Sequence, residues 1–71
     1  DMDRAIADLD QAIKLDPKDP RAFHNRGFAW RNKGDPDRAI ADFDEALKRD
    51  ANYTVAFYNR GNAYFLKKEY D

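Results

Sequence analysis

The sequence predicts an all-α fold, a solenoid in which four helices form antiparallel pairs within 71 residues. Three observations predict it. One block of sequence returns after a fixed interval, which is typical of stacked helical or strand units. Apolar residues inside each block recur at helical spacing. Asp, Pro and Gly stand at the positions where such helices would begin and end.

The interval of the repeat is 34 residues. Segment 3–8 (DRAIAD) returns unchanged as segment 37–42, and segment 22–27 (AFHNRG) returns as segment 56–61 (AFYNRG). Of the 37 positions that can be compared at this spacing, 19 are identical. A period of this size indicates repeated supersecondary units, each of which buries its apolar face on its neighbours.

The first predicted helix covers residues 2–15. Its apolar residues are spaced so that they form one stripe on a helix, and they are Ala5, Ile6, Leu9, Ala12 and Ile13. Asp16-Pro17 ends this helix, because a proline disfavours helical geometry at the residue before it.

The second predicted helix covers residues 20–33. Asp19 offers a carboxylate as N-cap, and Pro20 suits the first helical turn. Within the helix, Phe23, Gly27 and Trp30 share one face. Gly34 follows, where a glycine in the left-handed conformation would end the helix.

The third and fourth predicted helices, 36–49 and 54–68, repeat these two patterns. Asp35 and Pro36 start the third helix, whose apolar stripe consists of Ala39, Ile40, Phe43, Ala46 and Leu47. In the fourth helix one face carries Phe57, Gly61 and Tyr64. The turn at Asp50-Ala51-Asn52 lacks the proline found at Asp16-Pro17, so the sequence leaves open whether the third helix ends cleanly.

Composition argues against several classes of function. The chain has 13 Lys and Arg against 14 Asp and Glu, and these charges are interleaved, whereas a nucleic-acid-binding module normally gathers basic residues on one face. It has no cysteine, no secretory signal and no apolar run near the roughly 20 residues that span a membrane. We therefore expect no nucleic-acid or membrane partner. The cellular location is open, with the cytoplasm favoured.

An enzymatic or metal-binding function has little support in the sequence. His24 is the single histidine, and the carboxylate pairs Asp8/Asp10 and Asp42/Asp44 recur with the repeat. A catalytic pair has no reason to recur in every repeat, whereas a solvated or salt-bridged helix face does. We expect no catalytic residue, no metal site and no cofactor.

The repeat resembles the tetratricopeptide repeat along essentially the whole chain. In its complete central unit the matching residues are Phe23, Gly27, Trp30, Ala39, Phe43 and Ala46; Ala5, Leu9, Ala12 and Pro17 match before it, and Phe57, Gly61 and Tyr64 after it. The resemblance implies a right-handed α-α superhelix with a half-repeat at 1–19, a complete repeat at 20–53 and a leading half at 54–71. It implies a structural core of Ile6, Leu9, Phe23, Gly27, Trp30, Ala39, Phe43, Phe57, Gly61 and Tyr64.

The resemblance also implies a function, which is a scaffold that binds a protein or an extended peptide in a concave groove lined by the first helix of each repeat. The expected groove residues are Arg21, His24, Asn25, Phe28, Arg31, Asn32, Val55, Tyr58, Asn59 and Asn62. Asn25 and Asn59 would form a ladder that bonds a peptide backbone, because an amide both donates and accepts. The alternative is that each Asn only bonds a neighbouring turn.

Arg26 and Arg60 stand where the family usually has Leu. They either hold a ligand carboxylate or pair across the stack with the repeating acids Asp8, Asp10, Asp42 or Asp44. Both charges share one period, which favours the structural pair. We therefore expect Arg26→Leu to be tolerated and Arg26→Glu to be costly.

A second functional hypothesis is self-assembly. The chain opens at Asp1 without an initiator Met, which is typical of a segment of a longer protein, and neither end has the polar cap that terminal repeats of a solenoid need. Ile6, Leu9 and Ile13 at the front, and Phe57, Tyr64 and Phe65 at the back, would be partly wet. We expect self-association through these uncapped ends, as head-to-tail stacks or swapped dimers.

Overall fold

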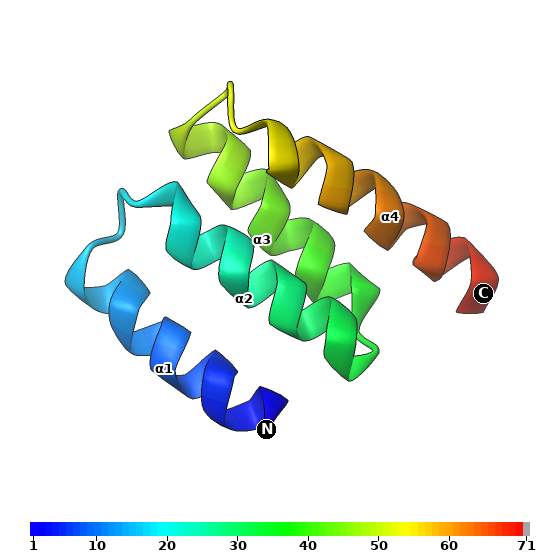
Figure 1. Ribbon diagram of the computed structural model, residues 1–71, viewed down its shortest axis with the longest axis horizontal. Helices are drawn as coiled ribbons and strands as arrows, with labels where there is room; N and C mark the ends of the chain where they lie inside the picture. The colour runs from blue at the N-terminus through cyan, green and yellow to red at the C-terminus, as the bar shows by residue number, and fades with distance from the viewer. Residues whose placement is uncertain (71) are drawn as a thin grey trace.

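A computed structural model describes residues 1–70, which form the helices α1 (Met2–Leu15), α2 (Pro20–Lys33), α3 (Pro36–Arg49) and α4 (Thr54–Tyr70). The four predicted helices are confirmed, and α4 runs two residues beyond the predicted end at 68. The helices lie side by side in chain order with alternating direction (Figure 1), in a body measuring 35 × 29 × 13 Å. Within residues 1–70, none of the helices combines the length and the apolar character needed to cross a bilayer.

The caps predicted from the sequence are present at the helix ends. The Asp19 carboxylate accepts a hydrogen bond from the Arg21 backbone N–H at 2.9 Å, and Asp35 accepts from that of Arg38 at 3.1 Å. Each bond satisfies a donor that has no partner inside its helix. Gly34 takes the left-handed conformation with φ of 92°, which ends α2 as predicted.

The turn after α3 is a clean break although it has no proline. Asp50 accepts two hydrogen bonds, one at its side chain from the Asn52 N–H (3.0 Å) and one at its carbonyl from the Tyr53 N–H (3.1 Å). Asp16 makes the same pair of bonds after α1, to the N–H groups of Lys18 and Asp19. The aspartate common to both turns therefore supplies the turn, because its side chain mimics a backbone acceptor.

The core lies between α2, α3 and α4 and is centred on Phe43, which is fully buried. Gly27 lies against it so closely that a Cβ at this position would stand 2.7 Å from the Phe43 ring. Ala39, Ala46, Ala56 and Ala63 are also fully buried. Small residues at these positions let paired helices approach, and the aromatic ring fills the space that remains.

Three predicted core residues are exposed, so their place in the core was wrong, whereas the expectation that Phe57 and Tyr64 would be partly wet is confirmed. Phe57, Gly61 and Tyr64 of α4 are exposed, whereas Ala56 and Ala63 of the same helix are buried against α3. Their equivalents on α2 are covered by α3. At the other edge Ile6 is buried, so the expectation that it would be partly wet was also wrong, whereas Leu9 is half-buried.

Candidate functional site

Arg26 ties three helices together. Its Nε and Nη2 donate to the two carboxylate oxygens of Asp42 on α3, at 2.8 and 2.7 Å. Its Nη1 donates to Asp10 on α1 at 2.8 Å. On α4, Arg60 Nη1 donates to Asp44 at 2.7 Å. The predicted structural pairing is confirmed, and Asp8 takes no part in it.

The spacing of the two aspartates on α3 explains why both are present. Residues two positions apart point about 200° apart around a helix, because each residue turns the chain by about 100°. Asp42 therefore reaches back to α2, while Asp44 reaches forward to α4. Hydrogen bonding to Asp42 is the main reason that the pKa of Arg26 lies above its ordinary value. Arg26 and Arg60 are therefore engaged in contacts between neighbouring helices.

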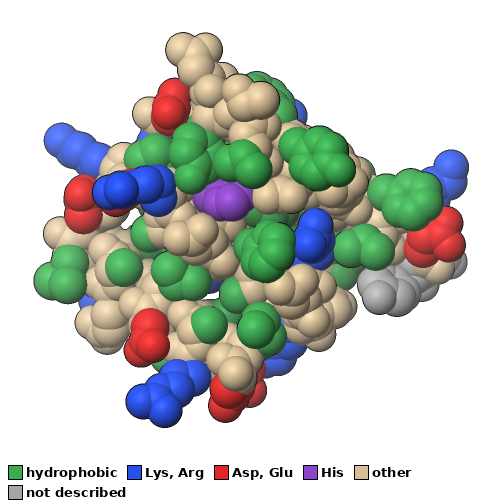
Figure 2. All heavy atoms as spheres, in the orientation of Figure 1, with side chains coloured by type: hydrophobic (Ala, Val, Ile, Leu, Met, Phe, Trp, Pro, Cys, Tyr) green, Lys and Arg blue, Asp and Glu red, His purple; other side chains and the backbone are tan. Residues whose placement is uncertain are grey.

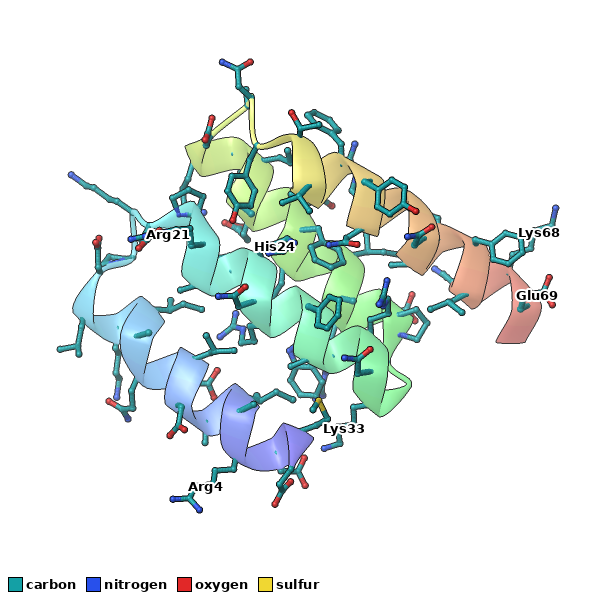
Figure 3. All side chains as sticks on the ribbon, viewed as in Figure 1. Arg4, Arg21, His24, Lys33, Lys68 and Glu69 are labelled. Carbon is teal, nitrogen blue, oxygen red and sulfur yellow. The ribbon has the colours of Figure 1, made fainter. Side chains whose placement is uncertain are left out.

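The ten predicted groove residues belong to α2 and α4, and we call the surface that they define the α2/α4 face. Figure 2 shows hydrophobic side chains gathered around the single histidine, and Figure 3 shows His24 between α2 and α4. Phe28, Val55 and Tyr58 are exposed large apolar residues, and the Tyr58 residue is 70% exposed. Asn25 and Asn32 are exposed as well, whereas Asn62 is half-buried.

His24 links the two helices at the centre of this face. Asn59 Nδ2 on α4 lies 2.8 Å from His24 Nε2, and His24 Nδ1 lies 3.4 Å from Asn25 Oδ1. A neutral ring with its proton on Nδ1 satisfies both contacts, because Nε2 then accepts from Asn59. Burial lowers the pKa of His24, and the hydrogen bond with Asn25 opposes that shift. The geometry therefore favours the neutral histidine.

The two asparagines are not equivalent, which changes the predicted ladder. Asn59 is only 7% exposed and its amide is bonded to His24, whereas Asn25 is exposed. Of the two asparagines of the predicted ladder, Asn59 closes the contact between α2 and α4, and only Asn25 is exposed. The internal repeat does not predict this difference, because Asn59 bonds a histidine that only one copy has. In the other copy Tyr58 stands at the position of His24.

Tyr53 supports the histidine and was missed by sequence reasoning. Its ring meets the His24 ring edge-on at 5.3 Å, and the Phe43 ring lies on another side at 5.6 Å. The signal that pointed to Tyr53 is its departure from the repeat. The equivalent residue is Asp19, which caps α2. Where one copy has a capping aspartate and the other has an aromatic residue, the aromatic residue indicates a packing role at that position.

Two arginines of this face differ in how their charge is used. The Arg31 guanidinium lies 4.7 Å from the centre of the Phe28 ring, which is a favourable cation–π distance and leaves both groups at the surface. Arg21 instead forms a salt bridge with Asp19 at 2.8 Å, and this hydrogen bonding lowers the pKa of Asp19. A ligand carboxylate would therefore meet Arg31 with less competition than Arg21.

Comparison with known proteins agrees with this architecture. A tetratricopeptide repeat model matches residues 1–54 and, in a second overlapping match, residues 31–71. No curated protein matches the chain. Tetratricopeptide repeats are generally non-catalytic modules for protein–protein interaction. With essentially all of its length covered by these matches, the chain belongs to the tetratricopeptide repeat family.

Proposed function

We propose that the α2/α4 face binds an extended segment of a partner protein and that the chain acts as a scaffold without catalytic activity. The observation that carries the proposal is the pair of exposed aromatic residues, Phe28 and Tyr58, on the two helices that the His24–Asn59 contact joins. Large aromatic side chains contribute strongly to interfaces when a partner covers them. Their positions on two different helices suit a ligand that crosses from α2 to α4.

The polar groups on this face suit a peptide backbone. Asn25 and Asn32 are exposed, and each amide offers donors and an acceptor to the N–H and C=O groups of an extended chain. Arg31, held over Phe28, offers donors for a ligand carboxylate. Asn59 acts indirectly in this proposal, since its bond to His24 keeps α2 and α4 at a fixed separation.

A displayed library of random 12-residue peptides tests the proposal without knowledge of the natural ligand. Peptides selected on the wild-type chain are titrated against Phe28→Ala and Tyr58→Ala by calorimetry. We expect each substitution to weaken binding by about 1–2 kcal/mol. Lys14→Ala on α1 is the control, because this exposed side chain lies outside the α2/α4 face. Selected peptides that bind both aromatic variants as tightly as the wild type would overturn the proposal.

Self-association is a second candidate function, and a different surface favours it. Phe57 and Tyr64 on α4 are 48% and 52% exposed. Neighbouring exposed aromatics of this kind are typical of protein–protein contact sites. Sedimentation of the chain over a wide range of concentration tests this candidate, and a monomer throughout would exclude it.

A further inference from the structure

The contact between α2 and α3 supplies a template for what α4 is shaped to bind. At the centre of this contact Arg26 holds Asp42 through two hydrogen bonds. Next to it Gly27 receives the Phe43 ring, and no side chain fits between them.

Two further pairs flank this centre. The Arg49 guanidinium lies 4.0 Å from the centre of the Phe23 ring. Toward the other end of the helix, the Arg38 guanidinium lies 4.7 Å from the centre of the Trp30 ring. Four positions along one face of α2 therefore each have an identified partner on α3. They are Phe23, Arg26, Gly27 and Trp30.

α4 presents the same four positions uncovered. They are Phe57, Arg60, Gly61 and Tyr64, and a Cβ built on Gly61 meets nothing within 4 Å. Arg60 Nη1 donates a hydrogen bond to Asp44, as Arg26 Nη1 does to Asp10. The edge formed by Nε and Nη2, which Arg26 uses for Asp42, makes no hydrogen bond within residues 1–70 on Arg60.

α1 carries the matching partner positions, also uncovered. The residues one period before Arg38, Asp42, Phe43 and Arg49 are Arg4, Asp8, Leu9 and Leu15. Arg4 and Asp8 are exposed, Leu15 is 86% exposed, and Leu9 is only half-buried where Phe43 is fully buried. α1 and α4 form opposite edges of the molecule, and Arg4 points away from its body (Figures 1 and 3).

We infer that copies of this chain dock head to tail, with α4 of one copy against α1 of the next in the register of α2 against α3. The inference rests on the proposed self-association and adds its partner surface and register. In this register Arg60 meets Asp8 of the second copy, and Gly61 meets its Leu9. Phe57 meets the second copy's Leu15, and Tyr64 meets its Arg4.

Each of these contacts is chemically favourable. The arginine–aspartate contact completes a two-bond pair between opposite charges. The leucine and phenylalanine are both apolar, and the arginine on tyrosine repeats the cation–π contact of the template. Because the two surfaces are different, the contact does not close on itself in a pair, and open stacks are the expected product.

Sedimentation equilibrium of the 71-residue chain and of two variants tests the register. Asp8→Arg places like charges opposite each other in the contact, and we expect association to weaken about tenfold or more. Ala7→Arg is its control, because the equivalent Ala41 stays exposed on the packed helix α3. Gly61→Gln fills the space that Leu9 of the second copy needs, while a Cβ at this position meets no atom of another helix within 4 Å in the single chain. It should abolish association and leave the melting temperature of the dilute chain unchanged or higher.

Exchanging the two charges of the contact between copies provides an independent test. Mixing the Asp8→Arg chain with an Arg60→Glu chain should restore association, since each copy then offers the other an opposite charge. Circular dichroism checks that Arg60→Glu is folded; if it is not, the Gly61→Gln result decides. Association that is unaffected by Asp8→Arg and Gly61→Gln would overturn the register but not self-association. A wild-type chain that stays monomeric would overturn both.

Discussion

α2 and α4 carry the same motif and experience different surroundings. Phe23 on α2 is 6% exposed, whereas its equivalent Phe57 on α4 is 48% exposed. Ala29 and Ala63, which are also equivalent, are buried on both helices, and Ala63 packs against α3. The comparison teaches that the motif determines which residue points to which neighbour. How much each residue contributes to the free energy of unfolding then depends on whether that neighbour is present.

The largest expected effect separates Phe23 from Phe57. Phe23→Ala removes a buried ring and should cost about 3–5 kcal/mol, which is comparable to the whole stability of a domain this small. Phe57→Ala should cost less than about 1 kcal/mol, because that ring is half in water already. Urea unfolding of the dilute chain, followed by circular dichroism, measures both. Equal losses would show that α4 is covered in solution.

The next effect separates Arg26 from Arg60 and revises the expectation that Arg26→Leu is tolerated. Asp42 is buried, so Arg26→Leu would leave its carboxylate without a partner, at a cost of about 2–3 kcal/mol. Arg60→Leu should cost under about 1 kcal/mol, because Asp44 is half exposed and returns to water.

The double variant Arg26→Leu/Asp42→Asn checks this interpretation in the same unfolding experiment. It removes the unpaired charge, so it should recover most of the stability lost in Arg26→Leu. Arg26→Glu should be the most costly change at this position, since it opposes two carboxylates. An Arg26→Leu variant as stable as the wild type would show that Asp42 gains solvent once the arginine is gone.

The two glycines should respond to alanine in opposite directions. At Gly27 the new methyl group would meet the Phe43 ring at 2.7 Å and the Ala39 carbonyl at 3.1 Å, so Gly27→Ala should cost about 1–3 kcal/mol. At Gly61 the space is open, and Gly61→Ala should raise the stability of the dilute chain by about 0.5–1 kcal/mol through helix propensity. Melting temperatures measured at one low concentration show the sign of each change.

The smallest expected effect concerns His24 and pH. Because burial lowers its pKa in the folded chain, the unfolded chain binds the proton more readily. The contribution of neutral His24 is therefore present above its unfolded pKa of about 6.5 and is lost as pH falls toward the lower folded value. His24→Tyr, which copies Tyr58 of α4, is the control and should remove this part of the pH dependence. Identical pH profiles for the two chains would contradict the assignment.

Much of the fold was predictable because it depends on local chemistry. The bounds of the first three helices follow from apolar stripes, from the Asp-Pro starts of α2 and α3 and from the left-handed Gly34 after α2, all of which act within a few residues. The pairing of Arg26 was predictable as well, because arginine and aspartate recur at one period. Which aspartate it would choose was not, since that depends on how α2 and α3 are rotated against each other.

The α2/α4 face was less predictable, and Asn59 shows why. The repeat presents Asn25 and Asn59 as equivalents, yet only Asn59 is buried against the ring of His24, 35 residues away. Tyr53 completes that cluster from the turn before α4, at the position where the preceding copy has the capping residue Asp19. Contacts of this kind involve residues that differ between the copies, so no internal periodicity reports them.

By itself, the sequence determined the four helices, the ends of the first three and the residue types that face each neighbour, because these depend on turns, caps and a period of 34 residues. The tertiary structure alone decided which of two identical residues is buried, paired or free. Phe23 and Phe57 differ in this way, as do Gly27 and Gly61. The physical reason is that burial and ion pairing belong to a contact between two helices, and a motif on one helix specifies only half of that contact.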